Sequence, residues 1–346
     1  MEINLRYGFN KYSLRKKNIN GTSDTAAHNT NLVSLVETGE ISPSRALQLW
    51  SDKEKISVNN NSKDVSGSVQ LQSSIDTVLK ELDDLIGLDT IKVLVKELQA
   101  FITIQRHRTK QQLLTQPLVL HMIFKGNPGT GKTTVARVIG KLLNELEVLP
   151  KGHLIEVERA DLVGEYIGHT AQRTREHVKK ALGGILFIDE AYSLARGGEK
   201  DFGKEAIDVL VKAMEDHKDD FILILAGYKD EMEWFLLTNP GLRSRLPIHM
   251  EFPDYTVEEL LRIGDMMLEL RQYTMSDSAR EEFKRIITKQ CLSGHQHGGN
   301  ARLVRNVIEK AIRRQAVRLI KKEHLSREDL LNIRIDDLLE AVEDGD

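Results

Sequence analysis

The sequence predicts an α/β fold in which a doubly wound parallel sheet of five strands precedes a small domain of helices. Helical patterns at residues 133–146 and 171–182 separate several short apolar runs that are typical of strands. Strands that alternate with helices favour a parallel sheet covered on both faces, and ligands then bind at the carboxyl ends of the strands. The runs that predict the five strands are residues 118–124, 153–157, 185–188, 221–226 and 248–252.

Composition divides the chain into three regions. Residues 1–70 are rich in Asn, Ser, Lys and Thr and lack sustained apolar periodicity, which predicts a polar, largely disordered leader with room for a short helix at 43–50. Residues 71–253 hold a helical linker followed by the α/β region. Strand signals fade in residues 254–346, where we expect a small helical domain. Its helical patterns are residues 256–270, 278–290, 300–319 and 335–342.

Charge and composition exclude several classes of protein. With 49 basic and 52 acidic residues the formal net charge is -3, which gives no electrostatic reason to wrap nucleic acid or an anionic membrane. No apolar run reaches the roughly 18 to 20 residues that span a bilayer. The single cysteine, Cys291, excludes an intramolecular disulfide and fits a reducing compartment. We therefore expect a cytoplasmic protein with no membrane partner and no nucleic-acid partner.

A glycine-rich loop after the first predicted strand matches the phosphate-binding pattern G-x-x-x-x-G-K-[ST]. Glycines let such a loop curl until its N–H groups point at phosphate oxygens, and the following helix adds positive potential. A glycine-rich turn that happens to precede a lysine would match this pattern by chance in about one chain in a hundred. We expect Lys132 to reach the β- and γ-phosphates and Thr133 to bind Mg²⁺. The predicted nucleotide-binding residues of the loop are Gly126, Asn127, Pro128, Gly129, Thr130, Gly131, Lys132, Thr133 and Thr134.

Two acids end the third predicted strand, at the sheet edge where the phosphate loop should lie. Asp189 is expected to hold Mg²⁺ through water, and Glu190 to polarise the attacking water as a base or by orientation. Taken alone, two surface acids that cap a strand explain this pair equally well. Asp189 follows Lys132 by about 57 residues, which leaves room for one further strand and helix. The two motifs together predict an ATPase that uses ATP and Mg²⁺.

These motifs resemble those of the AAA+ superfamily, and within it the branch of stage V sporulation protein K and CbbX. The resemblance runs from about residue 75 to the end of the chain. It implies a P-loop ATPase core with a helical lid, assembled into a ring, with a hexamer expected, that pulls or twists a client protein. The matching blocks are residues 122–137, 151–170, 183–204, 226–228, 239–246 and 300–306.

The resemblance also places a pore loop and contacts with adenine. In AAA+ rings an aromatic-aliphatic-glycine triplet after the second strand grips a threaded polypeptide, and Tyr166, Ile167 and Gly168 occupy that position. From the residues alone, an ordinary loop with a packed tyrosine is the favoured interpretation. Ile86 and Gly87 resemble the segment that lies against the adenine, although a turn between two helices would look the same.

Arginines complete the implied site. Arg245, with Arg243 as second choice, occupies the position of the family's arginine finger. A neighbouring subunit inserts that residue to stabilise charge at the γ-phosphate. Arg302 resembles the lid arginine that touches the phosphates, and Arg305 could share that task. Without the resemblance, Arg302 and Arg305 would be the charged outer face of a helix. One departure is Tyr228, where many AAA+ proteins place a polar residue that orients the catalytic water.

The resulting hypothesis is an ATP-hydrolysing AAA+ remodelling motor that acts on a client protein in bacterial sporulation. The nearest alternative is the sister activity, a CbbX-like Rubisco activase, which shares the same core motifs. An alternative from another class is an ATP-gated assembly scaffold with little turnover, which the unusual Tyr228 supports. Clients are chosen by surfaces that a sequence pattern does not identify.

Overall fold

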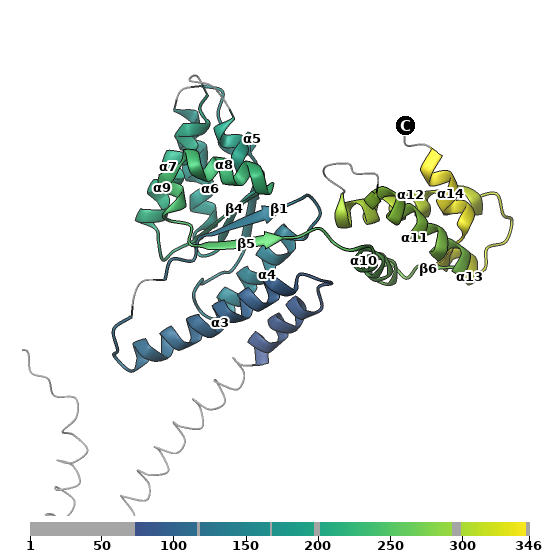
Figure 1. Ribbon diagram of the computed structural model, residues 1–346, viewed down its shortest axis with the longest axis horizontal. Helices are drawn as coiled ribbons and strands as arrows, with labels where there is room; N and C mark the ends of the chain where they lie inside the picture. The colour runs from purple at the N-terminus through teal and green to yellow at the C-terminus, as the bar shows by residue number, and fades with distance from the viewer. Residues whose placement is uncertain (1–72, 116–117, 167, 197–200, 293–298, 344–346) are drawn as a thin grey trace, which may run out of the picture. The chain divides into compact units, whose positions relative to one another are not determined.

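A five-stranded parallel sheet organises the computed structural model, which describes residues 73–115, 118–166, 168–196, 201–292 and 299–343. The strand order is β2-β3-β4-β1-β5 and every neighbouring pair is parallel, which confirms the predicted sheet (Figure 1). The predicted leader at 1–70, with its helix at 43–50, lies outside the described residues. The strands are β1 Met122–Gly126, β2 Leu154–Val157, β3 Ile185–Ile188, β4 Ile222–Gly227 and β5 Ile248–Phe252.

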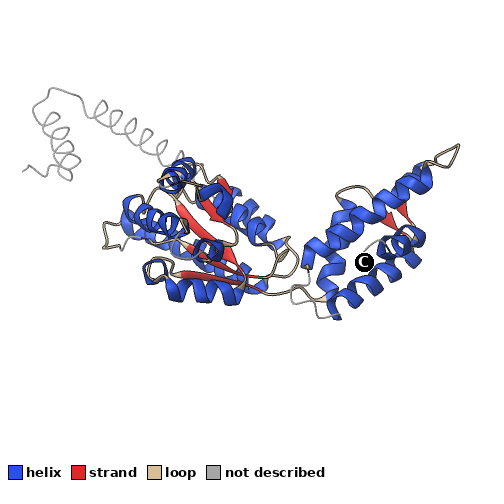
Figure 2. Ribbon diagram, turned by 90° about the horizontal axis from the view of Figure 1, so that it is seen from above, coloured by secondary structure: helices blue, strands red, loops and turns tan. Residues whose placement is uncertain are grey.

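Helices cover both faces of this sheet (Figure 2). In β1, Phe124 packs with α3 and α4, whereas Ile123 packs with α6, α7 and α8 on the other face. The same alternation holds in β3 for Phe187 and Leu186, as expected of strands buried on both faces. Figure 1 shows α3 and α4 on one side of the sheet and α5 to α9 on the other. The helices are α3 Asp89–Lys110, α4 Lys132–Glu145, α5 Arg159–Leu162, α6 His169–Ala181, α7 Gly203–Asp216, α8 Lys229–Thr238 and α9 Pro240–Arg243, with a 3₁₀ turn η1 at Ala191–Ala195.

The first strand begins later than the sequence predicts. The predicted strand 118–124 is replaced by β1, which starts at Met122 and continues to Gly126. The buried side chain of His121 accounts for the shift, because its Nδ1 accepts the Leu223 N–H of β4 at 3.0 Å. A side chain thus occupies the ladder position that a backbone carbonyl of a longer strand would use.

The region after the sheet is helical, and its helices lie close to the predicted ranges. A capping box begins α10: Thr256 Oγ1 accepts the Glu259 N–H at 3.2 Å, and Glu259 accepts the Thr256 N–H at 2.7 Å. Two short strands, β6 and β7, form a parallel pair within this helical region, where the sequence shows little strand signal. The elements are α10 Val257–Glu269, β6 Thr274–Met275, α11 Asp277–Leu292, α12 Asn300–Leu319, α13 Arg327–Leu331, β7 Asn332–Ile333 and α14 Ile335–Glu343.

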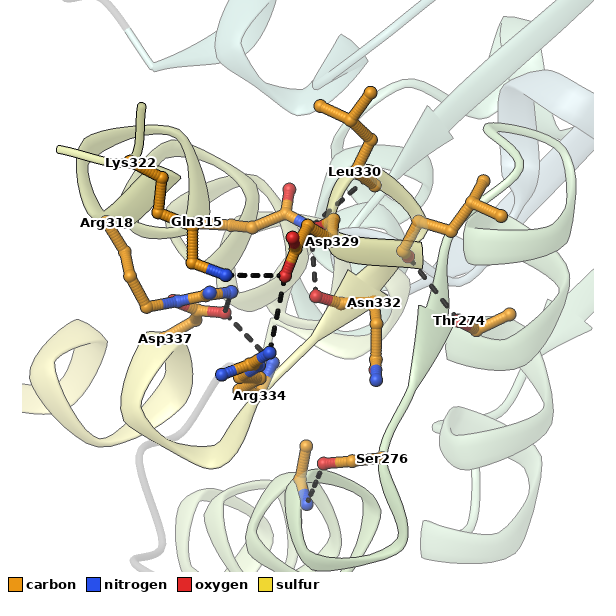
Figure 3. A network of polar contacts seen from close by, with 12 residues as sticks. Thr274, Ser276, Gln315, Arg318, Lys322, Asp329, Leu330, Asn332, Arg334 and Asp337 are labelled. Atoms are coloured by element: carbon orange, nitrogen blue, oxygen red, sulfur yellow. Dashed lines mark hydrogen bonds and ion pairs between the residues drawn. The ribbon is translucent and has the colours of Figure 1, made fainter. Parts of the chain in front are cut away.

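A polar network fixes the end of this region to α12 (Figure 3). The buried Gln315 amide donates to three backbone carbonyls, those of Asp329, Leu330 and Asn332, at 3.0 to 3.3 Å. Arg318 forms a two-pronged ion pair with Asp337, with both N–O distances at 2.8 Å. These bonds hold β7 and α14 against α12. Among the described residues, no helix combines the length and the apolar character needed to cross a membrane.

Candidate active site

A cavity of about 360 Å³ lies at the carboxyl edge of the sheet, where the sequence predicts a nucleotide site. Five parts of the chain line it: the β1–α4 loop with the start of α4, the end of β2, the end of β3, the end of β4 and the start of α12. Its size falls in the range of small-molecule sites. The lining residues include Lys132, Asp189, Glu190, Tyr228 and Arg302.

The phosphate loop has a backbone that side chains would obstruct. Gly129 and Gly131 have φ angles of 75° and 93°, a region that residues with a Cβ rarely adopt. A Cβ on Gly129 would lie 2.6 Å from the Gly299 carbonyl oxygen and 2.9 Å from the Arg302 nitrogen. The loop is therefore a cradle of backbone groups at the amino end of α4, which suits phosphate oxygens.

The outer side of the same loop is bonded to residues that follow the sheet. Three consecutive loop carbonyls each accept a hydrogen bond from the segment that leads into α10 or from the start of α12. The peptide N–H groups on the other side of these units are thereby held in place. The pairs are Asn300 Nδ2 to Pro128 O at 3.4 Å, Ala301 N to Gly129 O at 3.2 Å and Tyr255 Oη to Thr130 O at 3.3 Å.

Lys132 is folded onto its own loop. Its Nζ donates to the carbonyl oxygens of Gly126 and Asn127, both at 2.8 Å. Burial lowers the pKa of Lys132 from its ordinary value, and the carboxylate of Asp189 opposes that shift. The ammonium group therefore lies within the cavity and close enough to Asp189 for their charges to interact.

Thr133 has a partner that sequence reasoning missed. Its hydroxyl donates to Glu156 Oε1 at 3.2 Å, and the other carboxylate oxygen of Glu156 lies 3.3 Å from Arg137 Nη2. Both Glu156 and Arg137 line the cavity. The only sequence signal was an acid on a strand that ends at the predicted ligand edge, and that signal is weak without its contacts.

The two acids after β3 lie side by side at the cavity. The Glu190 N–H donates to Asp189 Oδ1 at 3.0 Å, and the Asp189 N–H donates to the Val157 carbonyl of β2 at 3.0 Å. Glu190 has a φ of 46°, an uncommon left-handed conformation for a residue with a side chain. Strain of this kind is found where function requires a particular side-chain direction.

Tyr228 brings an aromatic hydroxyl to the cavity beside Glu190. Burial raises the pKa of Tyr228, and the charge of Glu190 adds to that shift. Its ring lies 6.0 Å from that of Tyr192, and the Arg196 guanidinium covers the Tyr192 ring at 4.5 Å from its centre. The phenol therefore stays protonated and can donate a hydrogen bond within the cavity.

The arginines of α12 differ from those near α9. Arg302 and Arg305 both line the cavity, so neither is only part of a solvated outer face. In contrast, Arg243 and Arg245 are not among its lining residues. Arg245 is held by the Gly241 carbonyl, at 2.7 Å, and by an ion pair with Glu215.

The remaining predicted residues lie outside the cavity lining. Gly87 approaches α10, since a Cβ there would lie 3.0 Å from the carboxylate carbon of Glu259, and Ile86 packs in the helical region. Tyr166 is 66% exposed and contacts the His169 ring at 5.4 Å, so it is not a packed loop tyrosine. Gly168 caps α6 with a φ of 84°, and the predicted pore-loop residue Ile167 lies outside the described residues.

Comparisons with known proteins match most of the described chain. Residues 122–254 match the ATPase family associated with various cellular activities (AAA), and residues 256–345 match an AAA lid domain. Stage V sporulation protein K of Bacillus subtilis is 57% identical over 260 residues, which cover 75% of this chain and 81% of that protein.

Two further relatives are a Rubisco activase and protein CbbX. The chloroplastic ribulose bisphosphate carboxylase/oxygenase activase of Cyanidioschyzon merolae is 47% identical, over 78% of this chain and 93% of its own. Protein CbbX of Cereibacter sphaeroides is 48% identical, over 71% of this chain and 80% of its own. The chain therefore belongs to the AAA family of ATPases, in the branch that includes stage V sporulation protein K and CbbX, and it is a nucleotide-binding ATPase.

Proposed function

We propose that the protein is a ring-forming motor, expected to be a hexamer, that uses ATP hydrolysis to remodel a client protein in sporulation. One observation carries the proposal: Lys132, Glu190 and Arg302 line one cavity, whereas Arg243 and Arg245 lie outside it. Arg243 and Arg245 would therefore act as finger arginines in the cavity of a neighbouring copy and not in their own. The 57% identity to stage V sporulation protein K supports the role in sporulation.

The cavity fits a nucleoside triphosphate with a divalent cation. The glycine cradle would offer N–H donors to the phosphates, Thr133 would bind Mg²⁺ through its hydroxyl oxygen, and Asp189 would hold the cation through water. When bound, Mg²⁺ would neutralise charge on the phosphate oxygens. Lys132 and Arg302 would contact the phosphates, while Ile86 and Gly87 would lie beside the adenine.

Glu190 is the residue we assign to the attacking water. Its carboxylate would accept a proton or orient the water, because phosphoryl transfer depends mainly on positioning and charge neutralisation. The left-handed backbone of Glu190 supports this role, since the strain directs the side chain of a cavity-lining residue. Residues 71–253 would form the nucleotide-binding part and residues 254–346 the lid.

Tyr166, Ile167 and Gly168 are the proposed pore loop. The 66% exposure of Tyr166 supports this assignment, because an exposed aromatic ring is available to grip a polypeptide. The cytoplasmic location predicted from the sequence stays a prediction.

Mixing two inactive variants tests the shared site. Glu190→Gln keeps the finger arginine, and Arg245→Ala keeps the acid, so each alone should hydrolyse ATP negligibly. In an equal mixture about a quarter of the interfaces should combine an intact acid with an intact arginine and restore about that share of wild-type turnover. Mixtures with Arg243→Ala identify which arginine acts. A mixture that stays inactive with both arginine variants would contradict a finger supplied by a neighbour, and negligible wild-type turnover would favour the scaffold.

A Rubisco activase is the second candidate, supported by the 47% identity to the activase of Cyanidioschyzon merolae. Glu190→Gln should bind ATP without cleaving it and retain the client in the ring. Recovery of a sporulation protein on this variant supports the main proposal. ATP-dependent reactivation of inhibited Rubisco by the wild-type protein would support the alternative instead.

A further inference from the structure

We propose that Glu156 is a positioning residue for magnesium. It accepts the proton of the Thr133 hydroxyl, so that the lone pairs of the hydroxyl oxygen can face the cation. This inference deepens the proposed function and rests on it. Glu156 lies outside the glycine loop and outside the acid pair after β3, and no motif in the sequence marks it.

The position of Glu156 follows from the order of the strands. It is the next-to-last residue of β2 and pairs with Phe187 of β3, two residues before Asp189. Parallel pairing therefore brings Glu156 to the same sheet edge as Asp189. Both residues line the cavity, together with Thr133. The carboxylate thus reaches the phosphate loop from the strand at the sheet edge.

The hydrogen bond to Thr133 is the central contact. Thr133 Oγ1 donates to Glu156 Oε1 at 3.2 Å. Among the described residues, Glu156 is the side-chain partner of this hydroxyl. A hydroxyl that gives a lone pair to a cation must direct its proton elsewhere. A bound cation makes that proton a stronger donor, and a charged acceptor strengthens the bond further. Glu156 is placed to be this acceptor.

Arg137 orients the carboxylate from the other side. It lies four residues after Thr133 on α4, so both side chains are on the same face of the helix. Its Nη2 lies 3.3 Å from Glu156 Oε2, which leaves Oε1 for Thr133. The side chains of Arg137 and Glu156 are 58% and 43% exposed, so this ion pair contributes little to folding. The contacts of Glu156 therefore favour a role in cation binding over one in stability.

The test measures magnesium dependence without requiring hydrolysis. The dissociation constant of the fluorescent nucleotide mant-ADP is measured with excess Mg²⁺ and again with EDTA. The constant in EDTA divided by the constant with Mg²⁺ reports how much the cation contributes to binding. Loss of a residue that hydrogen-bonds to a metal ligand typically lowers metal affinity by about 10- to 100-fold. Glu156→Ala should therefore reduce the ratio about tenfold. Affinity in EDTA should be unchanged or slightly tighter, because the substitution removes a negative charge near the phosphates.

A double-mutant cycle asks whether Glu156 acts through Thr133. Thr133→Ala should itself reduce the ratio, and adding Glu156→Ala should reduce it no further. Glu251→Ala is the matched control, since Glu251 is an exposed acid on β5, the opposite edge strand, and pairs with Lys229 outside the cavity lining. That control should leave the ratio unchanged.

The outcomes separate this inference from the proposed function. An unchanged ratio in Glu156→Ala, or an equal loss of affinity with Mg²⁺ and with EDTA, would overturn the positioning role while the ATPase site stands. Additive losses in the double variant would show that Glu156 does not act through Thr133, and would overturn it as well. A wild-type protein that binds no mant-ADP under either condition would remove both proposals.

Discussion

The side-chain amide of Asn300 donates a hydrogen bond to Asp254 at 2.7 Å, and its carbonyl accepts the Tyr255 N–H at 3.0 Å. Asp254 also accepts the amide of Asn127, in the phosphate loop, at 2.9 Å. Asn300 is buried and has a φ of 45°, so it holds an uncommon backbone conformation at the start of α12. One carboxylate thus joins the phosphate loop to the first residue of a helix that is distant in sequence.

Loss of the Asn300 side chain should therefore destabilise the fold. Asn300→Ala removes a buried amide and leaves the part-buried Tyr255 N–H without its acceptor, so we expect the free energy of unfolding in urea to fall by about 2 kcal/mol. Asn300→Asp should cost more, because it places like charges together. Asn239→Ala is the control, since it removes a half-exposed amide bond to the Phe235 carbonyl. Equal losses of unfolding free energy in all three variants would show that the bond to Asp254 stabilises the fold no more than the Asn239 bond does.

Relief of strain at Glu190 should raise stability while removing activity. Glycine accepts a φ of 46° without strain, so Glu190→Gly should gain about 1 kcal/mol of unfolding free energy. Glu190→Gln keeps the Cβ and should match the wild type in stability. Both variants lack the carboxylate and should lose ATP turnover, measured as phosphate release. A glycine variant less stable than the glutamine variant would contradict the strain argument.

Stability should fall in mild acid because of His121. Burial lowers the pKa of His121 from 6.5 to about 4, although its backbone hydrogen bond with Met214 opposes that shift. The unfolded chain takes up this proton near pH 6.5 and the folded chain only near pH 4, so stability is lost as the pH falls through that window. The full effect is about 3 kcal/mol.

His121→Asn isolates this contribution. Asparagine keeps an acceptor for the Leu223 N–H and does not titrate. Unfolding in urea is measured for both proteins from pH 7.5 to 4.5, and the wild type should lose more stability than the variant over that range. A difference between the two that stays constant with pH would rule out His121 as the source.

The ion pair between Arg318 and Asp337 should matter more than exposed pairs do. Asp337 is 2% exposed, so Asp337→Ala leaves the Arg318 charge without its partner in a largely buried setting. We expect a loss of about 3 kcal/mol in unfolding free energy. Asp83→Ala breaks the exposed pair with Lys96 and should cost at most about 1 kcal/mol. Equal losses would show that burial of the pair has no effect.

Local patterns in the sequence predicted the sheet and much of the cavity. The glycine loop and the acids at Asp189 and Glu190 belong to short contiguous motifs, and strand order brings them to one edge. The start of β1 was misplaced because apolar character alone does not reveal that His121 accepts a bond from the next strand. The β6–β7 pair has two residues in each strand, too few for a periodic signal.

Residues that depend on distant contacts could not be found in this way. Glu156 is an ordinary acid on a strand until its hydrogen bond to Thr133 is known. Asn300 and Asp254 lie 46 positions apart, and Asn127 lies 127 positions from Asp254. Pairs at such separations follow from packing and leave no periodic mark in one sequence. Tyr228 was noted as a departure from the family pattern, but its place beside Glu190 came only from the structure.

The hydrogen bonds to the carbonyls of Pro128, Gly129 and Thr130 mean that the glycine loop is not a self-contained cassette. A chain shortened after residue 254 would keep the whole motif yet expose those carbonyls to water and lose the contact between Gly129 and Gly299. The same holds for a loop grafted onto another scaffold. Engineering of this nucleotide site therefore has to treat the loop and the start of α12 as one inseparable part.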